Sequence, residues 1–188
     1  MGLEVEIKLP VESHEQTRQK LRDLGADFLR EGIETNWIYD RDNGSLRTGG
    51  LGLRLRTVDV TSGKPFPATL TVKGPLLPGP FKRRDEFEIT VDNAETTNQM
   101  LAMLGFTCVL KYQKRRESWR FMQCNVELDE PPHIGMFVEI EGPDDGCIRA
   151  AQKSLGLGSI FHLPQSYPHL LLVHCRKAGL AIDDVKLP

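Results

Sequence analysis

Short segments in which apolar and polar residues alternate recur along most of the chain. A period of two residues is typical of a β-strand with one buried face and one polar face. In the first segment, Glu4–Lys8, it places Val5 and Ile7 on one face and the charged residues on the other. The same pattern predicts strands at Glu4–Lys8, Asn36–Tyr39, Leu51–Thr57, Ala68–Lys73, Glu86–Val91, Trp119–Phe121, Asn125–Asp129 and Met136–Glu141.

Several of the connections between these segments are short and rich in turn-forming residues. They include Arg41–Ser45, Thr61–Pro65 and Asp129–Gly135, where Gly, Pro, Asp and Asn gather. Many gaps are too short for a crossover helix, so a mostly antiparallel sheet is expected. The segment Gly74–Arg83 contains three prolines and is expected to form a long mobile loop.

Helices are predicted in the longer gaps, where capping residues precede apolar residues at helical spacing. One runs from Ser13, as N-cap, to Gly25, and a second from Asp92, as N-cap, to Gly105. A third spans about 145–155, and a fourth about 166–178 with Ser166 as cap. Three strands that carry two acids each precede a helix that ends in Leu-Gly, which indicates a repeated strand-plus-helix unit with helices packed outside a sheet.

The composition is that of an ordinary globular domain. The 188 residues are 39% hydrophobic and 27% charged, and the formal net charge is -2. This balance provides no global basic field, so we expect no nucleic-acid partner held by bulk electrostatics, whereas a local basic pocket stays open. We expect a single domain over residues 1–175 and a peripheral C-terminal tail over residues 176–188.

The cysteines and the apolar runs indicate in which cellular compartment the protein is expected. Cys108, Cys124, Cys147 and Cys175 are widely spaced, which favours reduced thiols over a disulfide framework or a zinc site. The N-terminal segment is acidic within four residues and lacks a basic region followed by an apolar run. The apolar runs of the chain are shorter than the roughly 20 residues of a membrane span. We therefore expect a cytoplasmic protein without a membrane partner, and a homodimer is left open.

The polar faces of the strands carry pairs of like charges. Glu residues lie two apart in three strands and Arg residues two apart in one, at about 6.6–6.8 Å along a strand. Such a face ordinarily meets water, where opposite charges pair across strands for about 0.2–1 kcal/mol each. Neighbouring carboxylates of one strand gain nothing from each other, but they gain from a divalent cation, and arginine and lysine gain from phosphate. A closed barrel with these faces inside would suit a metal–polyphosphate complex.

In order along the chain, the charged motifs are similar to those of the CYTH superfamily, the triphosphate tunnel metalloenzymes. The segment Glu4–Lys8 resembles the ExExK signature of that family. The resemblance covers residues 3 to 175 and continues through Arg54-x-Arg56, Lys73, Arg84-x-Glu86-x-Glu88, Lys114-Arg115-Arg116, Asp129 and Glu139-x-Glu141. It implies an α+β fold: an eight-stranded antiparallel β-barrel, the triphosphate tunnel, with helices packed outside.

The resemblance also implies roles for the charged residues. Glu4, Glu6 and Lys8 would be catalytic. The expected phosphate-binding residues are Lys8, Arg54, Arg56, Lys73, Arg84, Lys114 and Arg116. The expected ligands of Mg²⁺ or Mn²⁺ are Glu4, Glu6, Glu86, Glu88, Asp129, Glu139 and Glu141. The choice of Lys114 and Arg116 over Lys111 and Arg115 follows from strand alternation, with a solvated basic cluster as the alternative.

The resemblance implies a metal-dependent enzyme that acts on a triphosphate. The segment Pro164–Leu172 is similar to the ending of the class IV adenylate cyclase branch, which favours conversion of ATP to cyclic AMP and pyrophosphate. Gln165 stands where that branch usually has Arg. The alternatives are an inorganic or thiamine-type triphosphatase that releases orthophosphate, and a noncatalytic triphosphate sensor. Tyr167 is interpreted equally as a functional residue and as an anchor of the last helix.

Overall fold

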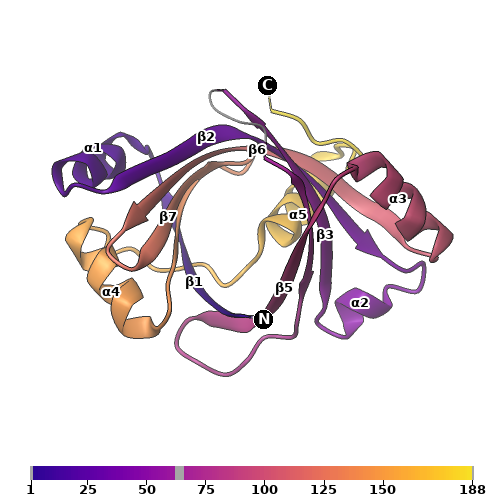
Figure 1. Cartoon of the computed structure of the whole chain (residues 1–188), viewed down its shortest axis with the longest axis horizontal. Helices are drawn as coiled ribbons and strands as arrows, with labels where there is room; N and C mark the ends of the chain where they lie inside the picture. Colours follow the sequence, from indigo (N-terminus) through magenta and orange to yellow (C-terminus); the bar gives the residue numbers. More distant parts are fainter. Residues whose placement is uncertain (1, 62–65, 188) are drawn as a thin grey trace.

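The chain forms a closed barrel of antiparallel strands (Figure 1). The computed structural model describes residues 2–61 and 66–187. Its strands are β1 (Gly2–Val11), β2 (Asp27–Asp40), β3 (Gly52–Val60), β4 (Ala68–Lys73), β5 (Lys82–Val91), β6 (Thr107–Phe121), β7 (Cys124–Glu130) and β8 (Met136–Glu141). They pair in the order β1-β5-β4-β3-β2-β6-β7-β8, and β8 closes onto β1. The predicted α+β fold with an eight-stranded antiparallel barrel is confirmed.

Helices cover parts of the outer wall of the barrel. They are α1 (Glu15–Asp23), α2 (Ser45–Thr48), α3 (Ala94–Met103), α4 (Asp145–Ser154) and α5 (Tyr167–Ala178). The apolar face of β1, with Val5 and Ile7, packs in one core cluster with Leu21 of α1 and Ile148 of α4. Leu55 of β3 packs in another cluster with Leu101 of α3. Because apolar side chains point outward to the helices, the alternating charged side chains must point into the barrel.

The repeated strand-plus-helix unit is present and each copy ends in the same way. Gly25, Gly105 and Gly156 follow α1, α3 and α4 with φ of 71°, 79° and 74°. This left-handed conformation favours glycine, because any other residue would place its Cβ against the backbone. Leu-Gly is therefore the stop signal that turns each helix back toward the barrel.

Two predicted N-caps are displaced by one residue. His14, rather than Ser13, is the N-cap of α1, although the Ser13 Oγ accepts a hydrogen bond from the Glu15 N–H at 3.1 Å. Asn93, rather than Asp92, caps α3 by accepting from the Thr96 N–H. The predicted N-cap of α5, Ser166, and the predicted proline in its first turn are both confirmed.

The strand boundaries were underestimated most in β2 and β6. Only Asn36–Tyr39 and Trp119–Phe121 were expected, but the two strands pair with each other along almost their whole lengths. In the central part of β2 both faces are buried, so the two-residue alternation is lost there. In β6 the alternation persists, with Leu110, Tyr112 and Lys114 buried and the residues between them less so. The expected turn Arg41–Ser45 leads into the short helix α2, and residues 62–65 of the expected turn Thr61–Pro65 lie outside the described residues.

One end of the barrel is closed by α5 and the C-terminal segment. Leu110 and Tyr112 of β6 and Phe137 of β8 pack in one apolar cluster with Tyr167 and Leu171 of α5. Figure 1 shows α5 within the outline of the barrel opening. The interior of the barrel is therefore blocked at this end by an apolar cluster.

The segment after α5, which was expected to be peripheral, lies against β6. Val185 is buried, its N–H donates to the Lys111 carbonyl at 2.8 Å, and its carbonyl accepts from the Gln113 N–H at 2.9 Å. The expected boundary near residue 175 falls inside α5, which continues to Ala178. Part of the tail thus adds to the packed body of the protein.

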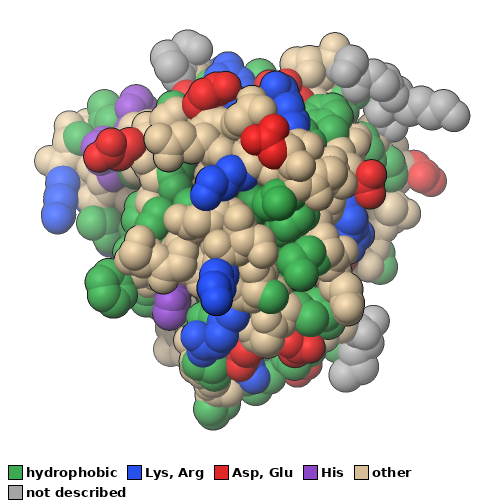
Figure 2. Space-filling view, turned by 90° about the vertical axis from the view of Figure 1, so that its left-hand side faces the viewer, with side chains coloured by type: hydrophobic (Ala, Val, Ile, Leu, Met, Phe, Trp, Pro, Cys, Tyr) green, Lys and Arg blue, Asp and Glu red, His purple; other side chains and the backbone are tan. Residues whose placement is uncertain are grey.

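The outer surface over α1 and α4 is chemically mixed. Figure 2, which views the left-hand side of Figure 1, shows acidic, basic and hydrophobic side chains interspersed on that face. Of the helices formed by the described residues, not one has the length and apolar character needed to cross a bilayer.

The closure by α5 can be tested by truncating its central side chain. Leu171 is fully buried, so Leu171→Ala is expected to lower the free energy of unfolding by about 2–5 kcal/mol. The matched control is Leu76→Ala in the loop after β4, where the side chain is 61% exposed and a change under about 0.5 kcal/mol is expected. Urea denaturation of both variants measures this, and equal losses would contradict the packing described for α5.

Candidate active site

The side of β1 that points into the barrel is charged, and β8 is the neighbouring strand. Glu4, Glu6 and Lys8 are all buried in the barrel although they are charged. Lys8 lies opposite Glu139 in the strand register, and its Nζ is 3.3 Å from the Glu139 Oε1. The ExExK segment therefore does turn its charged face away from bulk water, as the barrel interpretation predicted.

Basic residues of β4 and β5 neutralise the carboxylates of β1. The Arg84 Nε donates to the Glu4 Oε2 at 3.0 Å, and the Lys73 Nζ lies 2.7 Å from the Glu86 Oε2 while also contacting Glu4. Lys82 contacts Glu6. Each acid of this group thus has a basic partner, as a buried charge requires.

A second network, on β2, β6 and β7, surrounds Asp129. This carboxylate has no exposed surface and accepts from the Lys114 Nζ at 3.0 Å and from the Arg116 guanidinium at 2.7 and 2.6 Å. The Tyr167 hydroxyl donates to it at 2.9 Å. Arg116 also donates to Glu139 at 2.7 Å, which joins the network to β1 through Lys8.

Glu34 of β2, a residue that the sequence did not identify, completes this network. It is fully buried and lies 3.1 Å from Arg56, 3.4 Å from Lys114 and 3.9 Å from Arg116. Burial alone would raise its pKa, but these three cations outweigh burial and hold the pKa of Glu34 far below its ordinary value. Glu34 is therefore ionised and fixes the position of the basic wall.

Tyr167 connects the tunnel to α5. The Nζ atoms of Lys8 and Lys114 lie 4.1 and 4.8 Å from the centre of its ring, and its edge packs against Phe137. Its hydroxyl is buried beside Asp129, and burial followed by that negative charge raises the pKa of Tyr167 well above its ordinary value. Tyr167 thus both anchors the helix and contacts the tunnel, so the two interpretations of this residue are compatible.

Most residues that the sequence singled out are buried on the inner wall, but two carboxylates on the inner faces of β5 and β8 are more exposed. Glu88 has a side chain that is 43% exposed and faces Arg54 at 3.7 Å. Glu141 ends β8 opposite Glu6; the residue as a whole is exposed, but its carboxyl group is partly buried. The alternation placed β6 correctly: Arg115 is exposed and pairs with Glu130, and Lys111 pairs with Asp184 of the tail.

The sequence missed several inner side chains besides Glu34. Asn36 was recognised only as the start of a strand, and Lys82 was placed in the expected loop Gly74–Arg83. Glu127 and Ser118 are hydrogen-bonded to each other on neighbouring strands. Glu34 and Asn36 lie two residues apart on one strand, and this spacing was a weak signal that both point to the same face. Thr35 between them is also buried, so the alternation of buried and exposed residues is not visible there.

The carboxylates fit a divalent metal in chemistry but are not assembled around one. Among residues 2–61 and 66–187, no three or more His, Cys, Asp or Glu side chains are arranged as a ready metal site. Partial burial of the Glu141 carboxyl group, together with the carboxylates of Glu4 and Glu6, raises the pKa of Glu141 to about 7. This local excess of negative charge and of oxygen donors suits Mg²⁺ or Mn²⁺.

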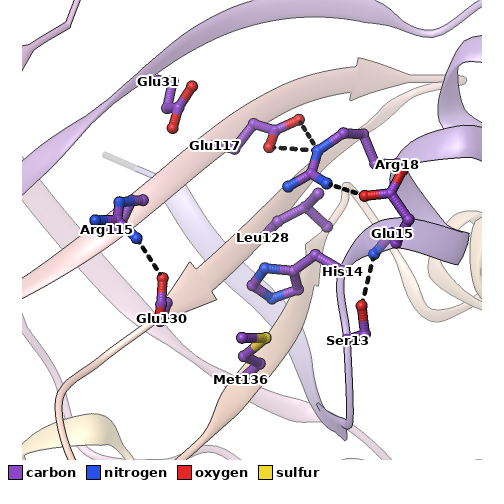
Figure 3. Close-up of a pocket in the computed structure, with 10 residues that line it drawn as sticks. All are labelled: Ser13, His14, Glu15, Arg18, Glu31, Arg115, Glu117, Leu128, Glu130 and Met136. Carbon is purple, nitrogen blue, oxygen red and sulfur yellow. Dashed lines mark hydrogen bonds and ion pairs between the residues drawn. The ribbon is translucent and has the colours of Figure 1, made fainter.

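A separate cavity of about 320 Å³ lies outside the barrel (Figure 3). It is bounded by His14 and Arg18 at α1 and by outward-facing residues of β6 and β7. Arg18 donates from its Nε to both oxygens of Glu117, at 3.2 and 2.9 Å. None of the predicted site residues lines this cavity, so the charged tunnel remains the candidate active site.

The importance of Glu34 for the basic wall can be measured as stability. Glu34→Gln leaves the buried Arg56 and Lys114 short of negative charge, so a loss of about 3–5 kcal/mol in the free energy of unfolding is expected. In the control Glu130→Gln the exposed pair with Arg115 is lost, which costs at most about 1 kcal/mol. Denaturant titration measures the free energy of unfolding of both variants. A loss for Glu34→Gln no larger than that for the control would refute the central role of Glu34.

Comparisons with known proteins agree with this geometry. The CYTH domain family profile matches residues 2–155. A Methanocaldococcus jannaschii protein named "Putative adenylate cyclase MJ0240" is 27% identical over 139 residues, which are 74% of this chain and 76% of that protein.

Solved structures share the fold across nearly the whole chain. The PH1819 protein of Pyrococcus horikoshii superposes with a TM-score of 0.76 at 26% identity, covering 90% of this chain and 98% of that one. A Vibrio parahaemolyticus protein named as a "putative adenylate cyclase" gives 0.75 at 20% identity, covering 91% and 98%. With a family profile that spans most of its length and a barrel of matching architecture, this chain belongs to the CYTH domain family.

Proposed function

We propose that this protein is a divalent-metal-dependent enzyme that acts on a triphosphate inside the barrel. The observation that carries the proposal is the inner wall itself, on which buried lysines and arginines face a group of carboxylates. The cations of this wall would bind the phosphate oxygens, and arginine forks suit them geometrically. Burial in the tunnel strengthens these charge interactions relative to water.

The metal would be held by Glu4, Glu6 and Glu141. When bound, Mg²⁺ or Mn²⁺ supplies charge neutralisation on the phosphates and activation of the attacking oxygen. In the metal-free protein, Lys73, Arg84 and Lys82 neutralise Glu4 and Glu6. We infer that these basic side chains turn from the carboxylates to the phosphates when metal and ligand enter together. The same cations would then stabilise the charge that develops on the phosphates during reaction.

The first candidate reaction is the conversion of ATP to cyclic AMP and pyrophosphate. The 3′-hydroxyl of ATP attacks the α-phosphorus, the bond to the bridging oxygen breaks, and pyrophosphate leaves with that oxygen. The names of the relatives in Methanocaldococcus and Vibrio support this reaction, as does the resemblance of Pro164–Leu172 to the cyclase branch.

The second candidate is a triphosphatase that releases orthophosphate. Gln165 stands where the cyclase branch usually has Arg, and it is exposed here; its main-chain carbonyl accepts from the Lys8 Nζ at 2.8 Å. A Hippeastrum protein of similar fold is described as a "putative adenylyl cyclase" with a dominant triphosphatase activity. It gives a TM-score of 0.66 at 18% identity, covering 97% of this chain and 98% of that one. Water would then attack the terminal phosphorus, and the remaining diphosphate would leave.

The two reactions are separated by their products. The purified protein is incubated with ATP or inorganic tripolyphosphate, with Mg²⁺, Mn²⁺ or a chelator, and cyclic AMP and orthophosphate are quantified. Cyclic AMP from ATP is the expected result, with activity absent in the chelator because the carboxylates lack their cation. Glu6→Gln is expected to lower the rate at least about tenfold, since it removes a proposed metal ligand.

The outcomes of this assay contradict different parts of the proposal. Orthophosphate without cyclic AMP would exclude the cyclase and leave the triphosphatase. Binding of tripolyphosphate without any product, in any metal, would show a sensor rather than an enzyme. Activity that survives complete chelation would refute the metal dependence.

The raised pKa of Glu141 predicts a pH dependence in the metal-free protein. Because its pKa rises from 4.5 to about 7 on folding, the folded state binds the proton more tightly. Its contribution to stability is full below about pH 4.5 and is lost as pH rises through 7. Relative to Glu141→Gln, the wild type should thus lose stability between pH 5 and 8 in chelator, as measured by thermal unfolding. A difference between the two proteins that does not change with pH would contradict the assignment.

A further inference from the structure

Two buried donor groups of the tunnel lack a partner. The Asn36 side chain is fully buried, and its Oδ1 accepts from the Arg56 Nε at 3.1 Å. Because arginine only donates, this bond fixes the orientation of the amide and turns the Nδ2 away from Arg56. Among residues 2–61 and 66–187, the buried Asn36 Nδ2 and Arg54 Nε have no hydrogen-bond partner. Buried donors are ordinarily satisfied, so these two point to an acceptor that a ligand supplies.

The two donors lie beside the closed end of the tunnel. Asn36 is paired in register with Tyr112 of β6, which belongs to the apolar cluster around α5. Arg54 is paired with Ile38, and Ile38 packs against the same cluster. A ligand group that reaches these donors therefore has the apolar wall of α5 directly beyond it.

The local charge balance favours an anion at this place. Arg54 and Arg56 lie two apart on the same strand, and Arg54 meets a carboxylate only at 3.7 Å, from Glu88. Burial and then repulsion by Arg56 lower the pKa of Arg54 from its ordinary value. In contrast, Arg56 is paired with Glu34 at 3.1 Å. An acceptor with negative charge, such as a phosphate oxygen, would satisfy both the charge and the open donors.

We propose that Asn36 and Arg54 bind the terminal phosphate of the ligand at the blind end of the tunnel. This inference rests on the proposed function, since it takes a triphosphate as the ligand. It restricts the ligand to triphosphates with one free, unesterified end, including inorganic tripolyphosphate and nucleoside 5′-triphosphates. A triphosphate esterified at both ends is excluded, because its second organic group would have to occupy the space that Tyr112, Tyr167 and Leu171 fill.

The role of Asn36 is tested by changing the donor to an acceptor. Asn36→Asp keeps the size of the side chain and the oxygen that accepts from Arg56, but it presents negative charge in place of the Nδ2 donor. Affinity for inorganic tripolyphosphate, measured by calorimetry, is expected to fall about 10- to 100-fold, as for loss of a hydrogen bond to a charged group. The matched control is Gln123→Glu in the exposed turn between β6 and β7, which should bind as the wild type does.

A second readout separates ligand binding from a merely structural role. The new carboxylate of Asn36→Asp lies beside Arg54 and Arg56, so the ligand-free protein should melt at the same or a higher temperature than the wild type. A structural role would predict a lower melting temperature with unchanged affinity. That result, or an Asn36→Asp affinity equal to that of the wild type, would overturn the assignment of Asn36.

The requirement for a free end is tested with the wild type and three probes. Inorganic tripolyphosphate and ATP should bind, whereas diadenosine triphosphate, esterified at both ends, should bind at least about tenfold more weakly. Equal binding of all three would overturn the terminal-phosphate assignment and leave the proposed function intact. If none of the three binds, with or without Mg²⁺, the proposed function and this inference both fail.

Discussion

The compensation of buried cations by buried carboxylates is the constraint on which the tunnel depends. Glu34 and Asp129 have no exposed surface, and between them they hold Arg56, Lys114 and Arg116. A charge that is removed from water is costly unless it is paired. The barrel can therefore carry these three buried cations because the two carboxylates, on β2 and β7, are built into the same wall.

This pairing also divides the inner wall into one region with an excess of carboxylates and another with an excess of hydrogen-bond donors. Around Glu4, Glu6 and Glu141 the acids are in excess, as the raised pKa of Glu141 indicates. Around Asn36 and Arg54 the donors are in excess, since each keeps an N–H that has no partner in the described part of the chain. A cation suits the first region and an anion suits the second, which is the polarity expected for a metal–triphosphate complex.

The sequence predicted the barrel well and its interior less completely. In β1, β3 and β8 the outer face is covered by helices and the inner face is charged, so the alternation is clear. In β2, Glu34 and Thr35 are both buried, and the alternation that identifies an inner residue disappears. Lys82 was missed because the cluster at Lys82–Arg84 divides between the two faces, and only the register with β1 shows that Lys82 meets Glu6.

The helix that closes the barrel decides how a ligand can enter. Tyr167 ties α5 to Asp129, Lys8 and Lys114, so the blind end and the basic wall are held together. A chain of phosphates that enters such a tunnel must stop at the apolar cluster, and its last group meets whichever donors are placed there. The closure therefore does more than complete the core. With the proposed triphosphate bound, it would make the position of the terminal phosphate a consequence of the fold, and it would leave the organic end of the ligand toward the opposite mouth.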